Sequence, residues 1–187
     1  MCPDELMKIR TFLALELPQT VRNKLSSYVE LISGNDKLQQ IRWLPKENYH
    51  LTLAFLGNVD YVLISTLKLR LEQSSKQAVP FRFSEITPFP FSGTPKIAAA
   101  MLEHSDELMQ LQHNTDKCVR AFGISLERRR FAPHVTLGRL KSRSRKSIAF
   151  QPQQIFLEGV SEKVVISQSE LAPKGAVYTS LGEISLM

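Results

Sequence analysis

The sequence contains few of the residues that build disulfide scaffolds or low-complexity chains. Its 187 residues include only 2 cysteines, 8 glycines and 10 prolines. Cys2 stands alone near the start, and Cys118 falls within an apolar helical pattern. We therefore expect neither a disulfide framework nor a cysteine metal cluster, and a reducing cytoplasmic location.

Long apolar runs are also missing. The apolar stretch 12–15 is interrupted by Glu16 and ended by Pro18, whereas a membrane-spanning helix needs about 20 apolar residues. We expect no secretion signal and no membrane partner. With 43% hydrophobic and 22% charged residues, the composition is that of a folded protein, and the length suits one domain with a sizeable core.

Acidic residues are fewer than basic ones. The chain has 18 Asp and Glu against 24 Lys and Arg, a formal net charge of +6, which favours a polyanionic partner such as RNA. The densest basic segments are 128–130 and 141–146. Such segments attract an RNA backbone or form solvated loops, and Arg130 is a candidate for the first role.

Apolar periodicity predicts an α+β fold. Thr20 and Asp60 are placed to cap the first and second of three helices, and the third is expected to begin after Ser105. The segment 87–95 contains three prolines and one glycine, so we expect a loop there, near a boundary between two lobes. The strands are expected at 9–17, 41–44, 49–56, 81–86, 97–102, 131–140, 155–160, 164–171 and 178–184, and the helices at 21–32, 63–71 and 108–122.

The two halves of the chain repeat one arrangement. A strand near Ile9, a helix and a strand holding His50 are followed by a strand near Ile97, a helix and a strand holding His134. This predicts a single domain over 1–187 with two interleaved, pseudo-symmetric lobes. A cleft between the two lobes is then the expected place for a functional site.

The strings 50–53 and 134–137 each read histidine, apolar residue, threonine, leucine. In a strand, residues i and i+2 share a face, so each string directs a histidine and a threonine the same way. His113 and Thr115 have the same spacing but fall in the third helix, where they point apart. One strand histidine alone is more often structural. Two convergent imidazoles can serve as general acid and general base near neutral pH.

Four stretches carry a resemblance to a known family. Residues 12–18, 43–57, 130–139 and 169–178 resemble, in order, the motifs of the two-histidine phosphoesterases, and most closely the bacterial RNA 2′,3′-cyclic phosphodiesterases long called 2′-5′ RNA ligases. The resemblance implies a bilobal α+β fold in which antiparallel sheets line a central cleft and helices pack outside. It further implies metal-independent, cofactor-free hydrolysis of an RNA 2′,3′-cyclic phosphate to a 2′-phosphate. It also implies a monomer acting on RNA ends such as those of tRNA fragments, with 2′-5′ ligation as the reverse reaction.

The same resemblance assigns roles to residues. It implies that His50 protonates the departing O3′ and that His134 activates water. Thr52 and Thr136 would donate hydrogen bonds to the phosphate. Arg139 matches the family's arginine, although it lies five residues beyond His134 and would face away in a regular strand; a bulge at Gly138 would turn it back.

Aromatic residues near the first motif are candidates for contact with the terminal base. Tyr49 stands where the family has an aliphatic residue, and we count it as a candidate substrate-binding residue. Phe12 and Trp43 could also stack on a base, but core packing is the stronger expectation for both.

Two other functions stay open. The same histidines could act on another small cyclic phosphate or on 2′-5′ oligonucleotides, or the chain could be a non-catalytic RNA-binding module. A metal site is disfavoured because the sequence has no paired cysteines and no two histidines four residues apart.

Overall fold

The computed structural model describes residues 7–35, 39–73, 77–127, 130–141, 151–173 and 175–186. These residues form three α-helices, one short 3-10 helix and a nine-stranded antiparallel sheet, so the expected α+β class is confirmed. The elements are β1 (Lys8–Glu16), α1 (Gln19–Asn35), β2 (Ile41–Trp43), η1 (Lys46–Asn48), β3 (His50–Asp60), α2 (Leu63–Glu72), β4 (Val79–Phe89), β5 (Ile97–Leu102), α3 (Asp106–Ala121), β6 (His134–Leu140), β7 (Gln153–Ser161), β8 (Lys163–Ala172) and β9 (Gly175–Ser185).

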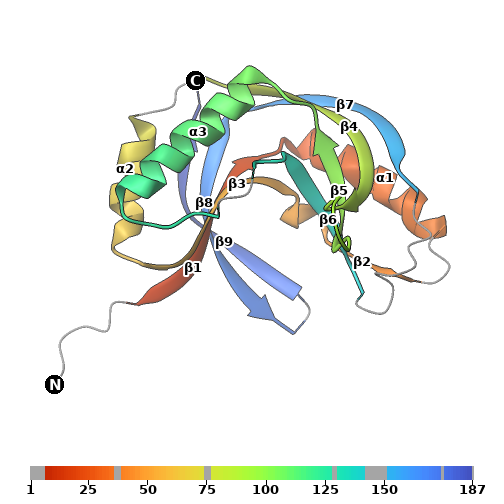
Figure 1. The fold of residues 1–187 in the computed structure, drawn as a ribbon, viewed down its shortest axis with the longest axis horizontal. Helices are drawn as coiled ribbons and strands as arrows, with labels where there is room; N and C mark the ends of the chain where they lie inside the picture. Colours follow the sequence, from red (N-terminus) through yellow and green to blue (C-terminus); the bar gives the residue numbers. More distant parts are fainter. Residues whose placement is uncertain are drawn as a thin grey trace.

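Eight strands of the sheet form two four-stranded halves, and the ninth, β2, pairs with β6 beside them. The strand order is β7-β4-β5-β6 followed by β3-β1-β8-β9, and Figure 1 shows the two groups on either side of the molecule. β3 and β6 meet through a single register pair, Leu51 with Val135. β2 pairs with β6 through Arg42 and Arg139 and their neighbours. The strands that carry the two histidines therefore lie at the junction of the halves.

The core lies between the sheet and the helices. Leu51 and Val135 are fully buried and belong to one hydrophobic cluster with apolar residues of all three helices, including Leu25, Leu67 and Leu108. α2 and α3 lie beside each other, while α1 packs near β7 (Figure 1). Because neighbours in a strand alternate between faces, the histidines beside Leu51 and Val135 point to the opposite face. Within the described residues, no helix is both long enough and apolar enough to cross a membrane.

The segment 87–95 is not a boundary between lobes. β4 continues to Phe89, which pairs with Ile97 of β5, so residues 90–95 join two neighbouring strands of one half. Pro88 is tolerated because β4 pairs with β7 only as far as Ile86 and is an edge beyond it. Apart from the short β2, which pairs with β6, the chain instead passes from one half to the other between β3 and β4, through α2, and again between β7 and β8.

Neither of the two expected helix caps is present. α1 begins at Gln19, so Thr20 lies inside the helix and does not precede it. α3 begins after Ser105, as expected, and the Ser105 hydroxyl caps it by accepting a hydrogen bond from the Leu108 amide at 3.2 Å. The cap expected at Asp60 is wrong, since α2 follows Val62 and has no side-chain cap. Asp60 is instead the last residue of β3, where it pairs with Lys8.

Candidate functional site

The register at the junction brings the two histidine motifs together. Leu51 on β3 pairs with Val135 on β6. In an antiparallel pair, a step forward along one strand is a step backward along the other, so the neighbouring positions place His50 opposite Thr136 and Thr52 opposite His134. These four side chains share the face opposite the buried Leu51 and Val135. Each histidine thus lies beside the threonine of the other motif.

Both imidazoles are fixed in the same way. His50 Nδ1 lies 2.8 Å from the carbonyl oxygen of Asn48, and His134 Nδ1 lies 2.7 Å from that of Ala132. A carbonyl oxygen can only accept, so each Nδ1 carries the hydrogen and donates it. In a neutral ring, Nε2 is then left with a free lone pair and can act as a base.

Aromatic side chains enclose each ring. Phe12 stacks on His50 with ring centroids 4.8 Å apart, and Tyr178 meets the same ring edge-on at 5.1 Å. The ring centroids of Phe89 and His134 are 4.6 Å apart. These contacts restrict the rotation of both imidazoles and remove them partly from water.

Burial lowers the pKa of both histidines. The pKa of His50 is lowered to about 4, chiefly by desolvation, with a further lowering by nearby His134. Desolvation also lowers the pKa of His134. The hydrogen bonds to Asn48 and Ala132 act in the opposite direction, because they stabilise the charged rings. The unliganded site therefore holds two neutral imidazoles at pH 7.

A cavity of about 1020 Å³ opens on the same side of the sheet. Its volume is large enough for a nucleotide, and its wall combines aromatic, hydroxyl and basic side chains. It is lined by Thr52, Leu53, Ala54, Phe55, Phe89, Pro90, Phe91, Ser92, Thr94, Lys96, Gln112, Asp116, Leu126, Glu127, Arg130, Phe131, Ala132 and His134.

A bulge brings Arg139 to the histidine face. In the β5–β6 pairing, Ala99 faces Thr136 and Ala98 faces Gly138, so Leu137 is an extra residue on β6. Arg139 pairs with Ile97, which shares its face with Ala99. The bulge expected at Gly138 is thus present, and it corrects the parity that would have turned Arg139 away.

The sequence-predicted residues divide between the site and the core. Arg130 lines the cavity, whereas the rest of the basic segments, 128–129 and 142–146, lies outside the described residues. The assignment of Tyr49 as a substrate-binding residue is wrong: its side chain is only 2% exposed and packs in the core beside η1. Trp43 packs against core residues, as expected. Phe12 is buried too, but its ring contacts His50, Phe55 and Tyr178 on the histidine face.

Two residues of the histidine face were not predicted. In the β1–β3 pairing, Ala14 faces Thr52 and Leu13 faces Ala54, so β3 has a bulge at Leu53 that matches the one in β6. This bulge places Phe55, 45% exposed, on the same face as His50. Arg42 on β2 is the second unpredicted residue of this face, because it pairs directly with Arg139 on β6. The sequence signal that could have identified Phe55 is its spacing: Phe55 lies five residues after His50, as Arg139 lies five residues after His134.

The described side chains do not form a metal-ligand cluster. Among them, no three His, Cys, Asp or Glu residues come together in a way that could hold a metal ion. Cys118 is buried in α3, away from the sheet face described above.

The fold and the paired histidine motifs define a phosphoesterase, and comparison with known proteins agrees. The family model described as LigT like phosphoesterase matches residues 15–96 and 101–154. The match covers well over half of the chain, including both histidine motifs. The chain therefore belongs to the LigT-like phosphoesterase family.

Individual relatives extend over nearly the whole chain. The RNA 2′,3′-cyclic phosphodiesterase of Thermus thermophilus is 31% identical, over 95% of this chain and 90% of that protein. The protein of the same name from Thermotoga maritima is 30% identical, over 94% of each chain. A crystal structure of a protein from Thermus thermophilus superimposes with a TM-score of 0.77 and 30% identity, over 95% of this chain and 98% of that one.

Proposed function

We propose that this protein hydrolyses the 2′,3′-cyclic phosphate at the end of an RNA and leaves a 2′-phosphate. The observation that carries the proposal is the register pair of Leu51 with Val135, which brings both histidines and both threonines around one point on one face of the sheet. The names of the Thermus and Thermotoga relatives support the same substrate. The reaction needs neither metal nor cofactor, because the two imidazoles supply both proton transfers.

The proposed mechanism uses one histidine for each proton. His134 Nε2 accepts a proton from water as the water oxygen attacks phosphorus. The P–O3′ bond breaks on the opposite side, and protonated His50 donates its Nε2 proton to O3′. The products are a 3′-hydroxyl and a 2′-phosphate. His134 then releases its proton to solvent, and His50 takes up a proton from solvent when the next substrate binds.

The transition state is stabilised by donors from both halves. Thr52 and Thr136 donate hydrogen bonds to the non-bridging oxygens, and Arg139 contributes positive charge from the same face. Arg130 lies on the cavity wall and attracts the RNA backbone. With a 5′-hydroxyl as the nucleophile in place of water, the same groups would break the P–O3′ bond and join two RNA ends through a 2′-5′ bond.

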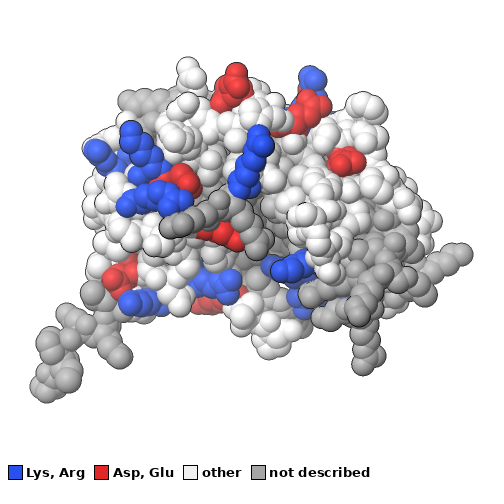
Figure 2. Space-filling model, viewed as in Figure 1, with Lys and Arg blue, Asp and Glu red and all other residues white. Residues whose placement is uncertain are grey.

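In the cell, we propose a monomer that works in the cytoplasm on RNA ends such as those of tRNA fragments. Residues 1–187 would form one two-lobed domain, because the half β3-β1-β8-β9 takes strands from both ends of the chain and the strands of the other half lie between them in the sequence. Figure 2 shows basic and acidic side chains interspersed on one face of the molecule. Local contacts at the site, rather than one uniform basic surface, would then position the RNA.

The test is turnover of a short RNA that ends in a 2′,3′-cyclic phosphate, in excess chelator. We expect wild type to form the 2′-phosphate, and His50→Ala and His134→Ala each to lose at least about 10²-fold in kcat. His113→Gln is the matched control, because His113 is exposed on α3. Wild type that binds this RNA without converting it would instead support an RNA-binding module.

A second candidate uses the same site on a different substrate. The cavity of about 1020 Å³ also accommodates a small cyclic phosphate or a 2′-5′ oligonucleotide. Comparing kcat/KM for the RNA, a nucleoside 2′,3′-cyclic phosphate and a 2′-5′ dinucleotide decides between them. A preference for either of the last two over the RNA would replace the proposed substrate and keep the mechanism.

A further inference from the structure

The two halves of the site are not equivalent beyond the histidines and threonines. A bulge in each histidine strand brings the residue five positions after the histidine onto the shared face. In β6 that residue is Arg139, and in β3 it is Phe55. One end of a nearly symmetric site is therefore cationic and the other is aromatic.

The cationic end contains a second arginine. Arg42 on β2 pairs directly with Arg139 on β6, and both side chains are exposed. Like charges directly across an antiparallel pair are destabilising. Within the described part of the chain, neither guanidinium forms an ion pair or a hydrogen bond with another side chain. An anion between them would remove the repulsion.

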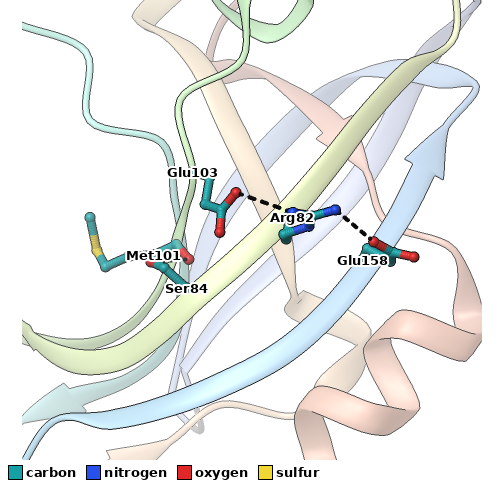
Figure 3. Close-up of polar contacts among 5 residues, drawn as sticks. All are labelled: Arg82, Ser84, Met101, Glu103 and Glu158. Atoms are coloured by element: carbon teal, nitrogen blue, oxygen red, sulfur yellow. Dashed lines mark hydrogen bonds and ion pairs between the residues drawn. The ribbon is translucent and has the colours of Figure 1, made fainter.

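In contrast, Arg82 on β4 of the same sheet forms ion pairs with acidic side chains of the protein. It lies between Glu103, at 3.9 Å, and Glu158, at 3.3 Å, as Figure 3 shows. Its charge is balanced by two carboxylates of the protein itself. The contrast makes Arg42 and Arg139 the pair suited to binding an external phosphate.

The aromatic end offers a surface for a base. Phe55 lines the cavity with 45% of its surface exposed, and the Arg10 guanidinium carbon lies 5.0 Å from its ring centroid. Phe12 lies parallel to it, 6.1 Å away and tilted by 7°. Aromatic rings and arginine planes of this kind bind unstacked bases.

The register sets the order of these groups along the junction. Arg139 comes first, then the level of Thr136 and His50, then the level of Thr52 and His134, and finally Phe55. Neighbouring levels are two strand residues apart, or about 7 Å, so the two ends are about 20 Å apart at the backbone. Long side chains reaching inward from both ends leave room for one nucleotide.

We propose that Arg42 and Arg139 bind the 5′-phosphate of the terminal nucleotide and that Phe55 stacks on its base. This inference rests on the proposed function and gives the RNA a direction. In a ribose, the base is attached next to C2′, and the 5′-phosphate is connected through C4′, next to C3′. A nucleotide placed this way has O3′ at the level of His50 and O2′ at the level of His134. That orientation accounts for His50 as the acid for O3′ by geometry alone.

Binding of product analogues tests the arginine part. We expect adenosine 2′,5′-bisphosphate to bind wild type roughly tenfold more tightly than adenosine 2′-monophosphate, because the additional phosphate meets two guanidinium groups. In Arg42→Gln this preference should fall to near one, while Arg82→Gln should keep it. A wild type without the preference, or an Arg42→Gln variant that retains it, would overturn the arginine assignment.

The aromatic part is tested with an abasic analogue. We expect Phe55→Ala to weaken adenosine 2′-monophosphate about tenfold and ribose 2-phosphate much less, because stacking on the base is the lost contact. Phe156→Ala is the matched control, since Phe156 is 93% exposed on β7. Equal weakening of both ligands by Phe55→Ala would contradict the stacking role. Absence of turnover in wild type would defeat the proposed function alone, because these measurements need only binding.

Discussion

At the scale of single residues, each histidine uses Nδ1 as an anchor, and both rings of the unliganded protein are neutral at pH 7. A general acid must therefore be created when the substrate binds. A phosphate anion does this, because its charge raises the pKa of a neighbouring imidazole. We expect adenosine 2′-monophosphate to bind at pH 7 with uptake of up to about one proton, and to bind more weakly as the pH rises. Calorimetry in two buffers with different ionisation enthalpies measures the uptake.

The control separates the site from the other histidines. His113→Gln should bind with the same proton uptake, since its ring is exposed on α3. His50→Gln should reduce the uptake. Wild-type binding that releases protons, or exchanges none, would show that the phosphate does not charge the pair.

A second residue-scale prediction concerns Thr136, which lies opposite His50. Thr136→Val keeps the volume and removes the hydroxyl donor, so we expect kcat to fall about 10²-fold with a smaller change in KM. Thr136→Ser should recover most of the rate because it restores the hydroxyl. The measurement is steady-state turnover of the cyclic phosphate RNA. A valine variant with wild-type kcat would remove the threonine from the mechanism.

At the scale of elements, Gly138 allows β2 to pack beside β6. A Cβ at this position would lie 2.5 Å from Ile41 Cγ2 and 3.0 Å from Trp43 Cε3. Gly138→Ala should therefore push β2 away, separate Arg42 from Arg139 and lower the free energy of unfolding by about 1–3 kcal/mol. Urea denaturation measures the change.

Gly34 provides the matched substitution. It lies in the last turn of α1, and a Cβ there would meet nothing within 4 Å. Gly34→Ala should be neutral or stabilising by up to about 1 kcal/mol. If both alanine variants have the same stability, the close contact at Gly138 does not constrain β2.

Sequence patterns predicted most elements, because alternation and helical periodicity are local. β5 was predicted with its observed bounds, and the alternation in β6 also indicated that a bulge was needed to turn Arg139. The end of β4 was missed because its prolines favoured a loop, and only the tertiary arrangement shows that this part of β4 is an edge. Arg42 was missed for a similar reason, since its pairing with Arg139 joins positions 97 residues apart.

At the scale of the whole molecule, the formal charge of +6 acts on a polyanion more than on a single nucleotide. We expect KM to rise with salt for both a dinucleotide and a mononucleotide 2′,3′-cyclic phosphate, but more steeply for the dinucleotide. The slope of log(1/KM) against log salt should be more negative by roughly 0.7 for each additional phosphate that is neutralised. Equal slopes would show that the phosphates beyond the reacting one do not contact the protein.

The junction of the halves also makes the whole fold sensitive to acid. β3 and β6 share one register pair, which lies between the histidines. The pKa of His50 is lowered from 6.5 to about 4 by folding, so below pH 6.5 the unfolded chain binds more protons than the folded one. The contribution of His50 to the free energy of unfolding is therefore constant above pH 6.5. It is lost as the pH falls towards 4, and the total loss is about 3 kcal/mol.

Urea unfolding from pH 7.5 to pH 4 tests this expectation against the background of titrating carboxylates. Wild type should lose about 2–3 kcal/mol more than His50→Gln over this range, because the variant has no imidazole to charge at the junction. His104→Gln should follow wild type, since His104 is exposed beyond the end of β5. If wild type and His50→Gln lose the same free energy, His50 is not held neutral by folding, and the site would already contain its acid before substrate binds.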